Sequence, residues 1–174
     1  QAYYEMGQLD KVIAPADKAI AAFGDNQNQN PYILKITSYY ERKLYKDAVK
    51  VLEVVVQLFP ENKQWWTQLG NFYTLVEDYK KAGYTLDAAY MQGFLEKESE
   101  IKLLANLYSS NGMPYRAAKL LEKHIASGLV KRDDSSLAAI ANAYHAAQHI
   151  STAAKYYGEL AKLTNDAKYY RKQG

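Results

Sequence analysis

The chain has 174 residues, of which 48% are hydrophobic and 24% are charged, a balance that is ordinary for a globular protein. Its 22 basic and 19 acidic residues are scattered, so the sequence shows no basic stripe for a nucleic acid or a membrane surface. Cysteine is absent, which excludes disulfides, thiolate metal sites and cysteine nucleophiles, and the longest apolar stretch, residues 51–59, is too short to cross a bilayer.

The N-terminal residues are typical of an incomplete helical pair. Tyr3 and Gly7 lie where a first helix would end, and a second helix is expected from about Leu9 to Phe23. Residues 24–31 are rich in asparagine, glutamine and glycine, a composition typical of a loop. We therefore expect residues 1–28 to form only part of a structural unit.

The stretch from Lys63 to Phe94 has the clearest helical pattern. Trp66, Leu69 and Tyr73 fall on one stripe of a helix, and Gly70 between them lets a second helix approach its backbone. The spacing predicts two packed helices with a small residue at their crossing. The residues that continue the pattern on the second helix are Ala82, Leu86 and Ala89.

The same residue types recur along the chain at intervals of 34, 35 and 36 residues. An offset shared by tyrosines and alanines indicates a true structural repeat. The predicted units are residues 29–62, 63–97, 98–133 and 134–166, followed by the start of a truncated unit at residues 167–174. The recurring residues are Tyr39, Tyr73, Tyr108 and Tyr144, together with Ala48, Ala82, Ala117 and Ala153.

Turn and cap residues separate the predicted helices of the later units. Gly112 and Pro114 indicate a turn that leads into a helix, because proline is favoured in a first helical turn. Asp134 or Ser135 is expected to cap the first helix of the unit at residues 134–166. Most of the tyrosines are expected to be packing residues whose hydroxyl groups lie at the surface.

The W-x2-L-G-x2-Y spacing of the central stretch resembles the tetratricopeptide repeat (TPR), a helix–turn–helix unit of about 34 residues. The resemblance implies an all-α fold, a right-handed α-solenoid of about five units in a single array over residues 1–174. In such arrays the first helices line a concave groove and the second helices form the outer surface. Array ends need polar capping elements, and because neither end of this sequence has one, we expect a fragment of a longer protein.

Four runs of the sequence resemble a narrower family. They are similar to the TPR proteins that accompany TonB/ExbB/ExbD energy-transduction systems in Gram-negative bacteria. This resemblance implies an exported, periplasmic protein that serves protein–protein contacts in TonB-dependent transport, with the cytoplasm as the alternative compartment. Because the runs consist mostly of packing residues, they carry over no binding site. The runs are Ala88–Leu95, Lys97–Glu100, Leu104–Tyr108 and Gly112–Ala118.

The TPR resemblance also predicts which residues face the groove. If Trp66 is the fourth residue of its repeat, the fifth, ninth, twelfth and thirteenth residues lie on one face of each first helix. Asparagine recurs at the ninth position, and its amide can both donate to and accept from the main chain of an extended peptide. An alternative stays open, in which each asparagine bridges neighbouring helices or faces solvent. The predicted peptide- or partner-binding residues are Thr67, Asn71, Thr74, Lys102, Asn106, Ser109, Asn142 and His145.

Two neighbouring patterns are given simpler interpretations. Lys102 and Asn106 resemble half of the two-carboxylate clamp that binds chaperone C-termini, but Ala139 stands where that clamp needs an asparagine. This departure disfavours the binding of chaperone C-termini, so Lys102 is interpreted as a lone exposed lysine. His145 and His149 have the i, i+4 spacing of a metal-ligand pair, yet no third ligand is evident. We interpret them as an ordinary, partly exposed pair.

Other candidate groups are expected to be structural. His124 lies at a packing position of a second helix, and the charged segment from Glu96 to Lys102 is expected to be a solvated capping segment. No nucleophile–base pair, phosphate loop or dinucleotide motif is present in the sequence. No catalytic residue, cofactor or metal is therefore predicted.

The sequence thus favours a non-enzymatic scaffold that binds a peptide or partner domain in its groove, with a TonB-system component as the candidate partner. One alternative is an RNA-binding helical repeat, which the lack of a basic groove disfavours. Another is a TPR region attached to an enzyme that lies outside this chain. Any oligomer is expected to form through aromatic residues at the truncated ends, Tyr3, Tyr4, Tyr169 and Tyr170.

Overall fold

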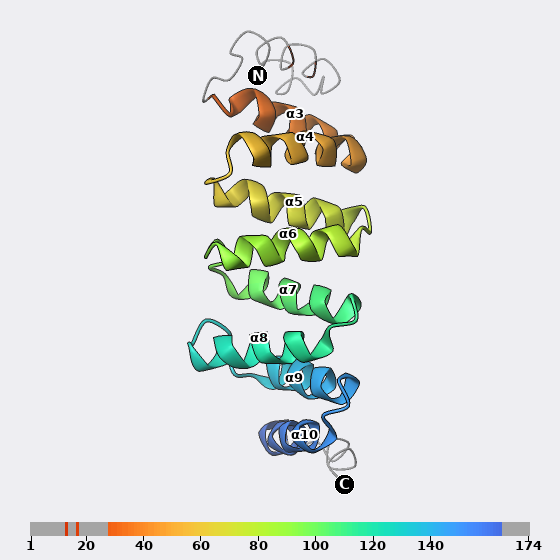
Figure 1. Ribbon diagram of the computed structural model, residues 1–174, viewed down its shortest axis with the longest axis vertical. Coiled ribbons are helices and arrows are strands. Elements are labelled where there is room, and N and C mark those ends of the chain that lie inside the picture. Colours follow the sequence, from red (N-terminus) through yellow and green to blue (C-terminus); the bar gives the residue numbers. More distant parts are fainter. Residues whose placement is uncertain (1–12, 14–16, 18–27, 165–174) are drawn as a thin grey trace. The chain divides into compact units, whose positions relative to one another are not determined.

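The computed structural model describes residues 28–164 together with Ile13 and Asp17 (Figure 1). Within this part of the chain every regular element is an α-helix, and none of these helices has both the length and the hydropathy needed to cross a membrane. Most of the helix predicted from Leu9 to Phe23, and all four terminal tyrosines, lie outside the described residues. The helices are α3 (Asn30–Glu41), α4 (Tyr45–Leu58), α5 (Lys63–Leu75), α6 (Tyr79–Met91), α7 (Glu98–Ser110), α8 (Pro114–Ala126), α9 (Asp134–Ala146) and α10 (Ile150–Thr164).

The helices belong to two compact units, one that ends at Thr85 and one that begins at Leu86, so the boundary falls within α6. In the first unit α4 packs against both α3 and α5. In the second unit α8 packs against α7 and α9, and α9 packs against α10. Short turns join consecutive helices into antiparallel pairs, which confirms the predicted all-α fold.

The apolar stripe predicted for α5 is buried, with one exception. Trp65, which is 4% exposed, is the buried tryptophan, and its indole Nε1 donates to Gln29 Oε1 over 2.6 Å. Trp66 is only half-buried, and its Nε1 donates to the Pro60 carbonyl over 2.8 Å. Trp66 therefore lies on the predicted stripe of the helix but is less buried than Leu69 and Tyr73. The buried ring belongs to the preceding residue, which lies one full turn before the buried Leu69 and shares its face of the helix.

The turn inside each helical pair is a Schellman motif that recurs with the period of the repeat. Two residues after each first helix the chain takes a positive φ, between 59° and 80°. The next N–H donates to the carbonyl of the recurring tyrosine, as Met113 does to Tyr108 over 2.7 Å. At this turn the predicted pair of Gly112 and Pro114 is confirmed. The residues with positive φ are Lys43, Glu77, Gly112 and Gln148.

Side-chain caps fix the starts of several helices. Asp133, which precedes α9 with extended backbone, caps this helix, because its carboxylate accepts from the Ser136 N–H over 2.9 Å. That hydrogen bond lowers the pKa of Asp133. The predicted caps, Asp134 and Ser135, are wrong by one or two residues, since both are already helical.

The charged segment before and within the first turn of α7 has the predicted capping role. The Glu100 carboxylate reaches back one turn and accepts from the Glu96 and Lys97 N–H groups, over 3.0 and 2.9 Å. Main-chain donors at the start of the helix are thereby satisfied.

A hydrogen bond from a tyrosine to a carboxylate recurs between successive helical pairs. In each case a tyrosine near the end of a first helix donates to an acidic side chain on the second helix of the preceding pair. We call these contacts the tyrosine–carboxylate clasps. They join Tyr73 to Glu53 in the first unit, and Tyr108 to Asp87 and Tyr144 to Glu122 in the second.

Four tyrosines depart from the expectation that most tyrosine hydroxyls lie at the surface. The rings of Tyr73, Tyr108 and Tyr144 are buried, and Tyr156 of α10 donates to the second carboxylate oxygen of Glu122. Burial, together with the carboxylate as partner, raises the pKa of Tyr73 to about 12. The same two causes raise the pKa of the other three tyrosines. These hydroxyls therefore act as hydrogen-bond donors within the fold.

Candidate functional site

A cleft of about 490 Å³ lies in the second unit, between α7 and α9. Helix α8 forms its floor through the buried side chains of Ala117 and Leu121. The walls consist almost entirely of small side chains, which leave space open between the two first helices. The lining residues are Ala105, Asn106, Ser109, Ala117, Leu121, Ser135, Ala138, Ala139, Asn142, Ala143 and Ala146.

Three of the predicted binding residues line this cleft. Asn106 and Ser109 project from α7, and Asn142 projects from α9, all of them exposed. Lys102 and His145 lie on the same two helices but are not among the lining residues. Two facing first helices therefore bring one amide each to the same space, and Ser109 and Ser135 add hydroxyls.

The other three predicted residues belong to α5 in the first unit. Asn71 is exposed and has no hydrogen-bond partner among the described residues. The hydroxyls of Thr67 and Thr74 donate to carbonyls of their own helix, those of Gln64 and Gly70, each over 3.0 Å. Both threonines can therefore still accept a hydrogen bond from a ligand, but their protons are already engaged.

The two asparagines of the cleft differ in their hydrogen bonding. Asn142 Oδ1 accepts from the Tyr157 hydroxyl of α10 over 2.5 Å, which fixes the amide and leaves its Nδ2 as a donor. Asn106 has no partner within the described part of the chain, so its amide offers both a donor and an acceptor. The interpretation of asparagine as a bridge between helices therefore applies to Asn142, while Asn106 is available to a ligand.

The cleft is wider than the predicted stripe. Ser135 and Ala139 of α9 and Ala105 of α7 line it beside the stripe positions, and none of the three was among the predicted binding residues. The groove positions predicted from the repeat cover only one narrow face of each first helix. Here the neighbouring positions also line the space because small side chains cover so little of the helix surface. A run of small residues beside a stripe position is the sequence signal for this widening.

The interpretation of Lys102 as a lone exposed lysine is wrong. Its Nζ lies 2.9 Å from Glu98 Oε1, one turn earlier, and Glu98 also accepts from the Lys131 N–H over 3.3 Å. The hydrogen bond from Lys102 lowers the pKa of Glu98, and the same contact raises the pKa of Lys102. Lys102 is therefore part of a pair that joins the start of α7 to the segment after α8.

The histidines have the surroundings that the sequence predicts. His145 and His149 are exposed, and the ring of His149 lies 4.9 Å from that of Tyr115. His124 is half-buried, with Nε2 2.8 Å from the Tyr90 hydroxyl, and burial lowers its pKa. No group of three or more histidine, aspartate or glutamate side chains among the described residues is arranged to hold a metal ion.

Replacing the two cleft asparagines separately is expected to affect stability unequally. Asn142→Ala removes the acceptor of the Tyr157 hydroxyl and is expected to lower the free energy of unfolding by about 1 kcal/mol. Asn106→Ala removes no internal hydrogen bond and is expected to change it by less than about 0.5 kcal/mol. Urea denaturation of the two variants measures the difference, and equal losses would contradict the assignment of Tyr157 as the partner of Asn142.

Antiparallel helical pairs that repeat every 34 to 36 residues, with a small-residue cleft between first helices, define a TPR-like helical repeat protein. A crystal structure of MamA matches with a TM-score of 0.68 at 20% identity, covering 97% of this chain and 90% of that chain. YrrB, described as a TPR protein with an unusual peptide-binding site, matches with a TM-score of 0.66 at 17% identity, covering 91% and 79%.

MamA from Desulfovibrio magneticus RS-1, from residue 41 to its end, matches with a TM-score of 0.65 at 16% identity, covering 95% of this chain and 90% of that chain. At such identities these likenesses show the fold alone, and they confirm the predicted TPR solenoid. The family ChAPs (Chs5p-Arf1p-binding proteins) matches residues 17–169. The chain belongs to this family. No curated protein sequence matches it.

Proposed function

We propose that the protein is a non-enzymatic scaffold that binds an extended peptide, or an extended segment of a partner domain, in the cleft between α7 and α9. The observation that carries the proposal is the open cleft of about 490 Å³, in which Asn106 has no hydrogen-bond partner among the described residues. A polar amide without a partner, at the wall of a concave space lined by small side chains, is available to a ligand's main chain.

The hydrogen-bonding groups of the cleft suit a peptide main chain. Asn142 presents its Nδ2 as a donor, because Tyr157 occupies its oxygen. Asn106 on the opposite wall presents both a donor and an acceptor. An extended peptide carries alternating C=O and N–H groups, so it can accept from one wall and exchange hydrogen bonds with the other.

The lining residues also determine how far the cleft can discriminate between peptides. None of the eleven lining side chains is charged. A peptide would therefore be held mainly through its main chain, with side-chain selectivity limited to what fits between alanines. The RNA-binding alternative is disfavoured for the same reason, because a nucleic acid needs cations along its phosphates.

Filling the cleft is expected to weaken peptide capture. Ala138→Phe places a bulky ring where a small side chain now lines the space, and it is expected to weaken binding at least tenfold, or about 1.4 kcal/mol. Peptides selected from a random display library on the unmodified chain serve as the probe. Their affinity is then measured by fluorescence anisotropy for both proteins.

Ala126→Phe is the matched control, since it adds the same ring at an exposed α8 position outside the cleft. Circular dichroism shows whether either variant has lost its helices. Equal binding by the Ala138→Phe variant and the unmodified chain would remove the cleft as the binding site.

We further propose, from the four sequence runs that resemble TonB-linked proteins, that this scaffold acts in the periplasm in TonB-dependent transport. The support is that resemblance alone. Capture from a periplasmic extract on the immobilised chain, followed by mass spectrometry, tests it. Recovery of TonB, ExbB or ExbD by the unmodified chain but not by the Ala138→Phe variant would support the proposal, and failure to recover any of them would count against it.

The family suggests a second candidate partner. ChAPs proteins are named for binding Chs5p and Arf1p, and the match extends over residues 17–169. We propose these two proteins, or close relatives of them, as alternative partners of the same scaffold. Direct titration of purified Arf1p and Chs5p into the chain distinguishes this candidate from the TonB-linked one, because each predicts saturable binding to a different set of proteins.

A further inference from the structure

The second unit carries another concave surface, on a different face of α8 from the cleft. It is open to solvent and has a volume of about 330 Å³. Ala117 and Leu121 face the cleft, whereas their neighbours Arg116 and Leu120 face this second surface. We call it the α8 basic pocket. Its lining residues are Tyr90, Tyr108, Tyr115, Arg116, Lys119, Leu120 and Lys123.

The pocket combines cations with aromatic walls and an apolar floor. Arg116, Lys119 and Lys123 follow one another at i, i+3 and i+7, so they form one stripe of α8. Leu120 is buried between them. No acidic side chain is among the lining residues. Carboxylates just outside the lining pair with Arg116 and Lys119, so the surplus positive charge of the pocket comes from Lys123.

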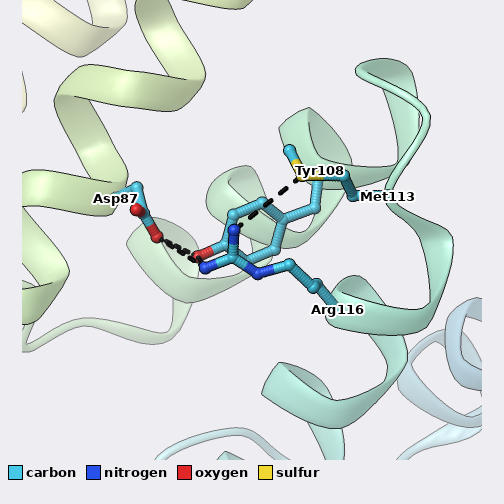
Figure 2. A network of polar contacts seen from close by, with 4 residues as sticks. All are labelled: Asp87, Tyr108, Met113 and Arg116. Carbon is cyan, nitrogen blue, oxygen red and sulfur yellow. Dashed lines mark hydrogen bonds and ion pairs between the residues drawn. The ribbon is translucent and has the colours of Figure 1, made fainter.

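Arg116 is held in place by its neighbours. Figure 2 shows its guanidinium over the Tyr108 ring, with a carbon-to-centroid distance of 4.5 Å, and Asp87 facing it. Its Nη2 donates to Asp87 Oδ1 over 3.2 Å and to the Tyr108 hydroxyl over 3.3 Å, while Nη1 lies 3.8 Å from Met113 Sδ. The side chain is still 54% exposed, so part of the guanidinium faces solvent.

The two lysines of the pocket make fewer polar contacts than Arg116 does. Lys119 Nζ lies 3.6 Å from Glu122, a carboxylate that already accepts from two tyrosines. Lys123 Nζ lies 5.8 Å from the centre of the Tyr90 ring and has no carboxylate partner within the described part of the chain. Tyr90 in turn is fixed by His124, since its hydroxyl lies 2.8 Å from His124 Nε2. Tyr90 is therefore held in place, and the ammonium group of Lys123 beside it can take an anion.

We propose that the α8 basic pocket binds an acidic peptide segment that also carries an aromatic or apolar side chain. The carboxylates would lie against Lys119, Lys123 and the exposed part of Arg116, and the apolar side chain would pack on Leu120 between the tyrosine rings. Charge complementarity and the apolar floor favour this occupant. A nucleic acid is disfavoured, because three cations within about 10 Å of one helix cannot follow a phosphate backbone.

Fluorescence anisotropy with the full chain tests the proposal. The probe is a short fluorescein-labelled peptide in which Asp and Glu alternate with Phe. Saturable binding is expected, and the double variant Lys119→Gln, Lys123→Gln is expected to weaken it about tenfold. The matched control is Lys155→Gln, Lys162→Gln, which removes the same charge from exposed positions on α10 and is expected to leave the affinity within about twofold.

Two further probes define what is recognised. A peptide with Asn and Gln in place of Asp and Glu is expected to lose the binding, and so is one with Ala in place of Phe. No saturable binding of the acidic peptide, equal loss in the two double variants, or tighter binding of a single-stranded RNA oligonucleotide would each overturn the proposal. The Ala138→Phe variant is expected to bind the acidic peptide normally, which separates this pocket from the cleft between α7 and α9.

Discussion

Raising the pH from about 9 to about 12 is expected to unfold the protein cooperatively. Unfolding is expected at a lower pH than deprotonation of the lysines alone would require. The cause is the set of tyrosine–carboxylate clasps. Burial and the carboxylate partner raise the pKa of Tyr73 to about 12, and they also raise the pKa of Tyr108, Tyr144 and Tyr156. In the unfolded chain the same hydroxyls lose their protons near pH 10.

The direction of the effect follows from the protons that each state binds. Below about pH 10 these tyrosines are neutral in both states and stability does not depend on them. Above it the unfolded chain releases protons that the folded chain keeps, so the free energy of unfolding falls as pH rises. For Tyr73 alone the loss by about pH 12 is on the order of 2 kcal/mol, and the buried Tyr108 and Tyr144 add to it. Domains are stable by only about 5–15 kcal/mol.

Urea midpoints at a series of alkaline pH values, together with tyrosinate absorbance, measure this loss. Tyr73→Phe is expected to flatten the decline, because it removes one proton that only the unfolded chain releases. Tyr84→Phe, at a tyrosine that is 69% exposed, is the matched control and is expected to leave the slope unchanged. Full tyrosinate absorbance near pH 10 from a chain that is still helical would contradict the assignment of the clasps.

The helical pairs were predictable because packing periodicity is local in the sequence. The alanines that recur with the repeat, such as Ala82 and Ala117, are at most 1% exposed, as a residue at a helix crossing must be. Gly112 and Pro114 placed one turn correctly, because glycine accommodates positive φ and proline suits a helix start. The equivalent turns have Glu77 and Gln148 at positive φ, and such residue types indicate no turn.

The clasps were not predictable in the same way. Glu53, Asp87 and Glu122 precede their tyrosines by 20 to 22 residues and lie on a different helix. An acidic residue on a helix is normally solvated, so nothing in the local pattern distinguishes a clasp from a solvent-facing charge. Only the packing of one helical pair on the next brings each carboxylate to a buried phenol.

The candidate cleft was predictable in part. The ninth position of the repeat placed Asn106 and Asn142 on facing helices, because assigning this position needs only helical spacing. It could not show that Tyr157, fifteen residues after Asn142 and on the next helix, would occupy its oxygen. Nor could it show the floor, since Ala117 and Leu121 appear in the sequence only as packing residues of a second helix. Hydrogen-bond partners and cavity shape depend on tertiary contacts that spacing does not contain.

Glu122→Ala is expected to lower the free energy of unfolding by about 3 kcal/mol, the largest effect expected of a single charged residue in the part of the chain that the structure describes. Glu122 accepts from Tyr144 of α9 with one carboxylate oxygen and from Tyr156 of α10 with the other. Each hydrogen bond to a charged acceptor contributes about 1.5 kcal/mol, and its removal leaves a phenol proton without a partner. The contact with Lys119, at 3.6 Å and on the surface, adds little.

Glu159→Ala is the matched control for this variant. Glu159 also lies on a helix of the second unit and is paired with Arg132, but both side chains are about half exposed, at 45% and 57%. Removing such a surface pair is expected to cost less than about 1 kcal/mol. Urea denaturation measures both variants, and a double-mutant cycle of Glu122→Ala with Tyr144→Phe isolates one hydrogen bond. If the two glutamate variants lose equal stability, or if the cycle gives no coupling, Glu122 does not tie α8 to the two helices that follow it.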